Sequence, residues 1–240
     1  MKYFKWNNVR LLLMLALMIF LYSFTSERNA NRTLRKSEVI FAGGSDRFVE
    51  VKTVNKLLIE NKTTVAGIRK VTLDLNKLEK TLNNHGMIEK SEVFVTVDGV
   101  LKAVVKQKTP IVRVLNGDGS YYIDYEGNKM PLSEVQSARL PLVSGAQNII
   151  NSEALIGFFR IIHDDDFLKK NIIGVLVLPN GNIKMKNRNF DYEIDFGKPL
   201  NIDGKFKNYK AFFQKASLDS TLYNYKMVNL KFSQQVVCTK

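Results

Sequence analysis

The sequence contains very few of the residues that metal and thiol enzymes depend on. Its 240 residues include one cysteine and two histidines. A single cysteine cannot form an intramolecular disulfide, and it cannot build a cysteine-based metal site. The catalytic patterns G-x-S-x-G, G-x-x-x-x-G-K-[ST] and H-E-x-x-H do not occur, and neither does a Cys–His arrangement. These absences exclude the enzyme classes that carry such motifs and leave carboxylate chemistry open.

Positive charge, by contrast, is in surplus. The chain has 36 Lys and Arg against 23 Asp and Glu, a net charge of +13. Such a surplus indicates an anionic neighbour: nucleic acid, an anionic membrane surface or an acidic polymer. Residues 1–40 account for +5 of it, and the other 200 residues for +8. Because no zinc finger, RNP-type motif or basic zipper occurs, nucleic acid is not an expected partner.

One long apolar run lies near the N-terminus. Residues 11–24 carry no charge, and extending the segment to 9–26 gives a helix of roughly 27 Å, close to a hydrocarbon core of about 30 Å. Arg10 can reach the interface with its long side chain. We therefore predict a transmembrane anchor over residues 9–26. Residues expected inside the membrane include Leu11, Leu15, Phe20 and Phe24.

Basic residues precede this run, which predicts a cytoplasmic tail at residues 1–8 and an extracytoplasmic location for the rest. A cleaved signal peptide and a buried N-terminal helix are the alternatives. A signal peptide has the same charged start, but Phe24 and the charges that follow fit a small-residue cleavage site poorly. No cysteine comes directly after the run, so a lipoprotein anchor is excluded.

The segment after the anchor predicts a small α+β domain. Residues 27–36 form a polar linker, and residues 37–108 give the order strand, helix, helix, strand, strand. The two helices are expected at residues 51–59 and 74–84, the second with Asp74 as its N-cap. The paired strands, at residues 92–97 and 101–105, are joined by a turn at Asp98-Gly99. About 70 residues in this order can bury two leucine faces on one side of a three-stranded sheet.

Residues 109–240 are predicted to be rich in strands and form a second, mainly antiparallel β domain. Two helices are expected, at residues 151–162 with Ser152 as the cap and at residues 203–215. Short strands are expected at residues 111–115, 121–123, 140–143, 172–178, 183–186 and 192–196. A last strand is predicted over residues 225–237, in which Val228, Leu230 and Phe232 alternate with polar residues.

Several motifs, in this order behind an anchor, resemble the cell-division protein family FtsQ/DivIB. Residues 93–97 with 101–105 look like the strands that close a POTRA unit. The other carriers are residues 108–112 (family "E-R-x-P-V-A"), 122–127 ("I-D-x-x-G"), 140–145 ("L-P-x-L-x-G") and 228–232 ("V-D-L-R-Y"). The chain departs from the family at Asn229, Lys231 and Phe232, where Asp, Arg and Tyr stand.

The resemblance implies a non-enzymatic scaffold in the inner membrane, with its bulk in the periplasm and a place at the division septum. Such proteins join FtsB-like and FtsL-like single-span partners and help recruit and regulate the septal peptidoglycan synthase. No cofactor, metal or catalytic residue is expected. The alternatives are an envelope transport or secretion adaptor with a POTRA domain, or a cell-wall hydrolase. The resemblance places FtsB-like binding on the last strand, at Val228, Asn229, Leu230, Lys231, Phe232, Ser233 and Gln234.

The last strand also suits that role on physical grounds, because a terminal strand at a sheet edge exposes unpaired N–H and C=O groups. The other interpretation is that its apolar residues belong to the core. His163-Asp164-Asp165-Asp166 is interpreted as a polar helix end and loop, since consecutive residues point in different directions. His85 and Cys238 are expected to have no chemical role.

Overall fold

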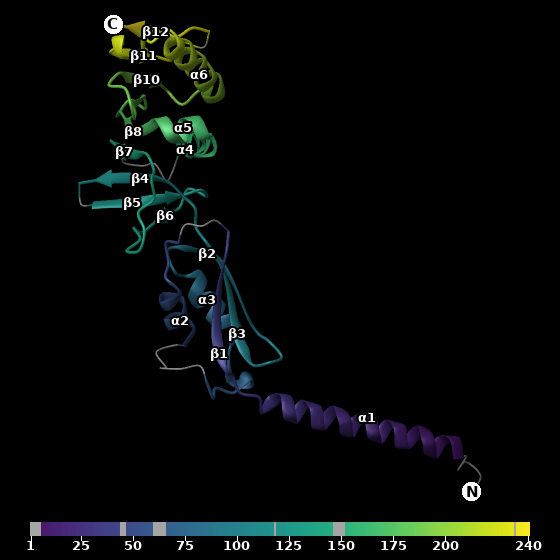
Figure 1. Ribbon diagram of the computed structural model, residues 1–240. Helices are drawn as coiled ribbons and strands as arrows, with labels where there is room; N and C mark the ends of the chain where they lie inside the picture. Colours follow the sequence, from purple (N-terminus) through teal and green to yellow (C-terminus); the bar gives the residue numbers. More distant parts are fainter. Residues whose placement is uncertain (1–5, 44–46, 60–65, 118, 146–151, 233) are drawn as a thin grey trace. The chain divides into compact units, whose positions relative to one another are not determined.

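The protein was analysed as a computed structural model, which describes the chain apart from residues 1–5, 44–46, 60–65, 118, 146–151 and 233. The chain divides into two units, Met1–Gln107 and Lys108–Lys240 (Figure 1). Each unit has its own sheet and its own hydrophobic interior, so the two are described separately.

The first unit begins with a long helix and continues as a small α+β domain. Its candidate membrane span, Asn8–Asn29, has 22 residues, which corresponds to about 33 Å of helix and is enough to cross a hydrocarbon core. Leu11, Leu15, Phe20 and Phe24 are exposed on this helix. The elements of the unit are α1 (Trp6–Ala30), β1 (Lys36–Ala42), α2 (Val51–Ile59), η1 (Lys70–Thr72), α3 (Leu75–Asn83), β2 (Ile88–Val95) and β3 (Val100–Gln107).

The sheet of the first unit has the order β1-β3-β2, with β1 parallel and β2 antiparallel to the central β3. Alternate residues of β3 are buried, and the buried faces of α2 and α3 supply Val54, Leu58, Leu78 and Leu82 to the same interior. The Asp74 carboxylate accepts a hydrogen bond from the Lys77 N–H and caps α3. The predicted strand–helix–helix–strand–strand order is confirmed.

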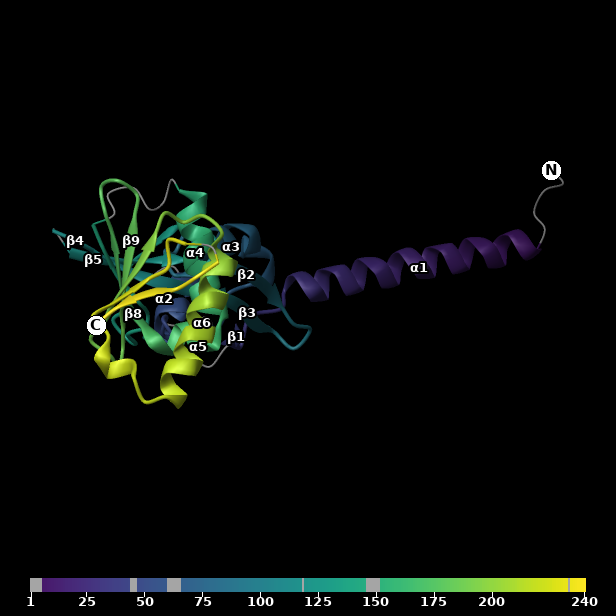
Figure 2. The ribbon, with the colours of Figure 1, turned by 90° about the horizontal axis from the view of Figure 1, so that it is seen from above.

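The second unit is one nine-stranded mixed sheet with helices on one side. The strand order is β12-β11-β10-β9-β8-β7-β4-β5-β6, and Figure 2 shows α4, α5 and α6 along one side of these strands. The elements are β4 (Pro110–Asn116), β5 (Gly119–Asp124), β6 (Lys129–Met130), β7 (Leu142–Ser144), α4 (Glu153–Asp164), α5 (Asp166–Asn171), β8 (Ile172–Val177), β9 (Ile183–Asn187), β10 (Glu193–Gly197), α6 (Ile202–Leu218), η3 (Leu222–Asn224), β11 (Met227–Asn229) and β12 (Val237–Thr239).

Antiparallel pairings predominate in this sheet, and three parallel pairings interrupt them: β4 with β7, β7 with β8, and β10 with β11. Aromatic rings fill the space between sheet and helices. Phe158, Phe196 and Phe206 lie with their ring centroids 5.0–5.5 Å apart. A buried hydrogen-bond network of Asn187, Tyr192 and Tyr209 then ties α6 to the sheet.

One prediction for this unit is confirmed in outline and one is wrong. A helix end and loop are predicted at residues 163–166, and α4 does end at Asp164, but the break is limited to Asp165, whose carboxylate accepts a hydrogen bond from the Leu168 N–H and starts α5. The last strand does not run through residues 225–237. It is divided into β11 and β12, which pair with each other in antiparallel fashion.

Candidate partner-binding edge of the β domain

The candidate site is the C-terminal edge of the second sheet, where three short strands lie in the order β10, β11, β12. Strand β11 pairs in parallel with β10 and in antiparallel fashion with β12, so both of its edges are occupied. The outermost strand is therefore β12 and not the segment 228–234 predicted from the sequence. Within the residues that the structure describes, no strand pairs with the outer edge of β12.

Two of the predicted site residues are core residues. Val228 is 0% exposed and Leu230 is 1% exposed, and both belong to the hydrophobic cluster beneath α6. The alternation of apolar and polar residues predicted one buried face correctly. Their side chains pack in the interior and are not exposed on the surface of the unit.

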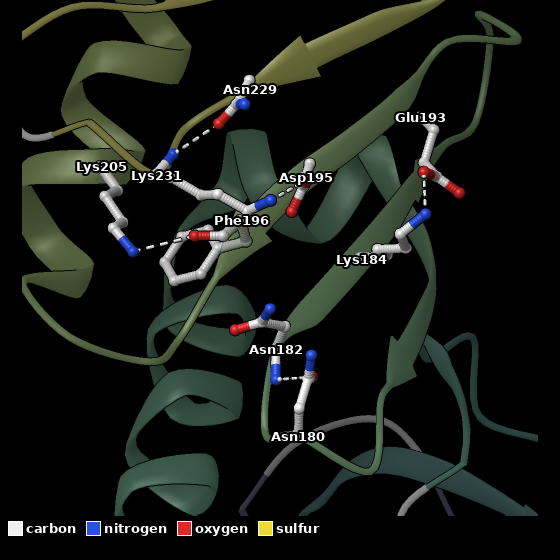
Figure 3. Close-up of polar contacts among 9 residues, drawn as sticks. All are labelled: Asn180, Asn182, Lys184, Glu193, Asp195, Phe196, Lys205, Asn229 and Lys231. Carbon is white, nitrogen blue, oxygen red and sulfur yellow. Dashed lines mark hydrogen bonds and ion pairs between the residues drawn. The ribbon is translucent and has the colours of Figure 1, made fainter.

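The polar neighbours hold the end of β11 in place, as Figure 3 shows. The Asn229 side-chain oxygen accepts a hydrogen bond from the Lys231 N–H at 3.0 Å. A side chain that binds its own backbone two residues later favours a turn, and this bond explains why the strand ends at Asn229. The Lys231 ammonium pairs with the buried Asp195 carboxylate at 2.6 Å.

A close packing contact accompanies that ion pair. Gly197 has φ +71°, and a Cβ added to it would lie 2.8 Å from Cγ of Lys231. The aliphatic part of Lys231 therefore covers the end of β10, where only glycine leaves room for it. Phe232 is 48% exposed and Gln234 is exposed, while Ser233 lies outside the described residues. Phe232 is thus the one large apolar side chain among the predicted site residues that a partner can reach.

A buried lysine lies next to this edge. The Lys205 ammonium donates to the Phe196 carbonyl oxygen at 2.8 Å (Figure 3). It also donates to the Lys198 carbonyl oxygen at 2.9 Å and lies 4.6 Å from the centre of the Phe196 ring. Burial lowers the pKa of Lys205, and the nearby Asp195 opposes that effect. Lys205 thereby fixes the loop after β10 to α6. No sequence motif predicts these hydrogen bonds.

Three other carboxylates, those of Glu193, Asp124 and Asp165, make contacts within the fold. Glu193 pairs with Lys184 at 2.6 Å, and this hydrogen bond raises the pKa of Lys184. Asp124 accepts from the Asn128 N–H at 2.7 Å and pairs with Lys108 at 3.1 Å, as suits a turn residue. Burial acts to raise the pKa of Asp165, but hydrogen bonds from Lys210 and from the backbone N–H of Leu168 outweigh it and lower that pKa.

The histidines do not gather ligands around them. Burial lowers the pKa of both His85 and His163. Nδ1 of His163 is buried without a hydrogen-bond partner, and its ring packs edge-on to Tyr125 with centroids 6.2 Å apart. Across the described part of the chain, no three His, Cys, Asp or Glu side chains come together as a metal site would require. Asp118 lies outside that part.

Comparisons with known proteins agree with this architecture. The family described as FtsQ/DivIB, C-terminal related, matches residues 109–239, and a POTRA-like domain matches residues 27–106. No curated protein matches the chain.

Among solved structures, the chain is similar to the major extracytoplasmic domain of the trans isomer of the bacterial cell division protein DivIB from Geobacillus stearothermophilus. The two are 13% identical over 47% of this chain and 95% of that one, with a TM-score of 0.31. Since so low a score does not define a common arrangement, the assignment depends on the family match, which covers more than half of the chain. The chain belongs to the FtsQ/DivIB-related family of cell-division proteins, with a POTRA-like domain ahead of the family's C-terminal region.

Proposed function

We propose that this protein is a non-enzymatic division scaffold, anchored by α1 through residues that include Leu11, Leu15, Phe20 and Phe24. In this proposal the N-terminus is cytoplasmic and both folded units lie in the periplasm. The β domain binds an FtsB-like partner, itself associated with an FtsL-like one. The scaffold thereby helps to recruit and regulate septal peptidoglycan synthesis at mid-cell.

The observation that carries the proposal is the free edge of β12, at the end of the region that matches the family. Such an edge offers main-chain N–H and C=O groups to an incoming strand. The Thr239 carbonyl accepts from the Lys226 N–H at 2.8 Å, so the peptide groups of Thr239 face inward. Peptide groups alternate in direction along a strand, and those of Cys238 therefore face the free edge.

The segment between β11 and β12 contributes specificity in this proposal. Lys231 retains a positive charge beside the edge, although the Asp195 carboxylate neutralises much of it. A lysine cannot make the two-pronged contact of the family's arginine, so we assign Lys231 to holding the turn. Phe232 supplies the apolar contact, and Asn229 and Gln234 contribute polar groups near it. Ser233 is included from its position in the sequence alone.

A proline at position 238 tests the edge directly. Cys238→Pro removes the outward N–H and places a ring at the free edge, while the inward bonds of Val237 and Thr239 to β11 remain possible. Loss of one such bond costs about 0.5–1.5 kcal/mol, roughly a 2–10-fold loss of affinity, before any steric clash is added. We expect co-purification of the FtsB-like partner with the full chain to fall by at least that factor.

Cys238→Ala is the matched control, because it removes the thiol and keeps the N–H, and it should retain the partner. Equal co-purification of both variants by folded protein would contradict the proposed edge. Localisation separates the division role from an envelope adaptor. A fluorescent fusion of the unchanged chain should form a mid-cell ring, whereas even staining of the envelope would count against the division scaffold.

A further inference from the structure

Three segments of the first unit meet beside the end of α1. The Lys70 N–H donates to the Arg32 carbonyl at 3.0 Å, and the Arg35 N–H donates to the Gly99 carbonyl at 2.8 Å. The segment that leaves the helix is therefore held between two others. We call the surface that they form the juxtamembrane surface, and its segments are residues 27–36, 67–72 and 96–99.

The turn at residues 96–99 lies directly on the segment that leaves the helix. Gly99 has φ +80°, and a Cβ added to it would lie 2.8 Å from the Thr33 carbonyl oxygen. The Arg32 guanidinium donates to the Val97 carbonyl at 3.2 Å. The three segments are thus held together by tertiary contacts, whereas the sequence alone predicts only a polar linker at residues 27–36.

This surface concentrates positive charge. Its acidic residues are Glu27 and Asp98, and its basic residues are Arg28, Arg32, Arg35, Lys36, Arg69 and Lys70. Within the part of the chain that the structure describes, none of these six cations forms an ion pair with a carboxylate. Three of the arginines line an open polar pocket of about 460 Å³ that also includes Asp98. Guanidinium groups without a carboxylate partner around such a hollow suit a phosphate group.

Two exposed valines accompany the cations. Val71 is 68% exposed on η1, and Val97 is 75% exposed on the turn between β2 and β3. Single exposed apolar residues are common on protein surfaces. Next to six basic side chains, however, they form the combination that binds a lipid interface, in which cations contact headgroups and small apolar groups enter the boundary.

The surface is also close to the membrane along the chain. The candidate span ends at Asn29, and Arg32 follows three residues later, at most about 11 Å away when fully extended. Arg32 in turn bonds to both of the other segments. An anionic leaflet therefore lies within reach of all three segments.

We propose that the juxtamembrane surface docks on anionic phospholipid headgroups of the leaflet from which α1 emerges. Its arginines and lysines contact the lipid phosphates, and Val71 and Val97 enter the interface. This docking is independent of the partner edge on the second unit. It would fix the POTRA-like domain against the bilayer and hold its far end, at Gln107, away from it.

A fluorescent probe at the valine of the turn tests this docking in the full-length chain. The Val97→Cys variant, made in a Cys238→Ser background, is labelled with an environment-sensitive nitrobenzoxadiazole dye. It is reconstituted into vesicles of phosphatidylcholine alone or with phosphatidylglycerol added. We expect the emission to be blue-shifted and brighter in the vesicles that contain phosphatidylglycerol, and high salt to reverse the shift because it screens the headgroup charge.

Matched variants test whether binding depends on this surface or only on the net positive charge of the protein. Arg69→Glu with Lys70→Glu should abolish the shift. Lys90→Glu with Lys106→Glu makes the same charge change near the opposite end of the sheet and should preserve it. A probe at Val51→Cys, on α2, should report water in both vesicle types.

Three results would overturn the docking: an aqueous probe at position 97 in both vesicle types, an equal shift in both, or equal loss from the two double variants. Salt acts on the unaltered surface, so the salt titration decides the question even if the Arg69→Glu, Lys70→Glu protein does not fold.

Discussion

The two sheets of this protein are held together in different ways. In the POTRA-like unit, seven consecutive residues of β1 pair with the central β3, and β2 covers the other edge of β3 over nearly its whole length. At the C-terminal edge of the β domain, β11 pairs with each neighbour over only three residues. Side-chain contacts add to these few main-chain bonds. The Lys231 ammonium pairs with the Asp195 carboxylate, and the Asn229 side chain accepts a hydrogen bond from the Lys231 N–H. An edge held by few main-chain bonds can adapt to a partner strand at low cost.

The strongest test of this contrast is a matched pair of core truncations. Leu82 and Leu230 are 0% and 1% exposed, so both changes to alanine remove the same buried atoms. Such truncations cost about 2–5 kcal/mol, less where the surroundings can collapse into the cavity. We expect Leu82→Ala to lie near the upper end and Leu230→Ala near the lower end. Hydrogen exchange of the full chain, followed separately in each unit, measures both.

Val71→Ala serves as the control for that pair, since this exposed side chain should change stability by no more than about 0.5 kcal/mol. A larger loss for Leu230→Ala than for Leu82→Ala would refute the idea that the C-terminal edge is the more adaptable one.

The sequence predicts those features of the two sheets that depend on interactions between residues close together in the chain. Helix α2 has the predicted bounds, Val51–Ile59, and Asp74 caps α3 as expected, because periodicity and capping act within a few residues. The split of the last strand was missed. Apolar and polar residues alternate through Phe232, which predicts a continuous strand. The strand nevertheless ends at Asn229, because its side chain accepts a hydrogen bond from the Lys231 N–H and favours a turn. Asp195 becomes a partner for Lys231 only because β11 lies next to β10, which one-dimensional patterns do not reveal.

The candidate site likewise has features that local sequence patterns predict and features that they do not. Burial of Val228 and Leu230 could be inferred from alternation alone. The identity of the outermost strand could not, since β12 has only three residues and no pattern of its own. In the first unit, the basic flank of the anchor is visible in the sequence. Its union with Arg69, Lys70 and the turn at Gly99 depends on tertiary hydrogen bonds.

The next largest effect concerns the exposed aromatic residue of the C-terminal edge. We expect Phe232→Glu to weaken binding of the proposed FtsB-like partner by about 1.5–3 kcal/mol if the ring is fully buried on binding, which is roughly 10–150-fold. Because Phe232 is half exposed, the fold should lose little stability. Titration of the purified full chain with the partner, alongside its thermal unfolding, distinguishes the two quantities.

Phe232→Tyr is the conservative counterpart, because it keeps the aromatic ring, and it should bind normally. Unchanged binding by folded Phe232→Glu would exclude this side chain from the interface and leave only the main chain of β12. That result would sharpen the contrast between the two sheets, because recognition of the partner would then depend on main-chain hydrogen bonds to β12 alone.

The smallest expected effect tests a contact that sequence patterns did not predict. The Lys210 ammonium on α6 pairs with the Asp165 carboxylate at the start of α5. The pKa of Asp165 is lowered in the folded state, so this contribution to stability is present above the unfolded pKa of about 3.8 and is lost as the pH falls through the folded value. Both side chains are partly exposed, and we expect about 0–1 kcal/mol. Lys210→Met should therefore unfold more easily than the unchanged chain at pH 7, with the gap closing in strong acid. A gap that persists below pH 2 would mean that the aliphatic part of Lys210 stabilises this helix pair by packing, and not by charge.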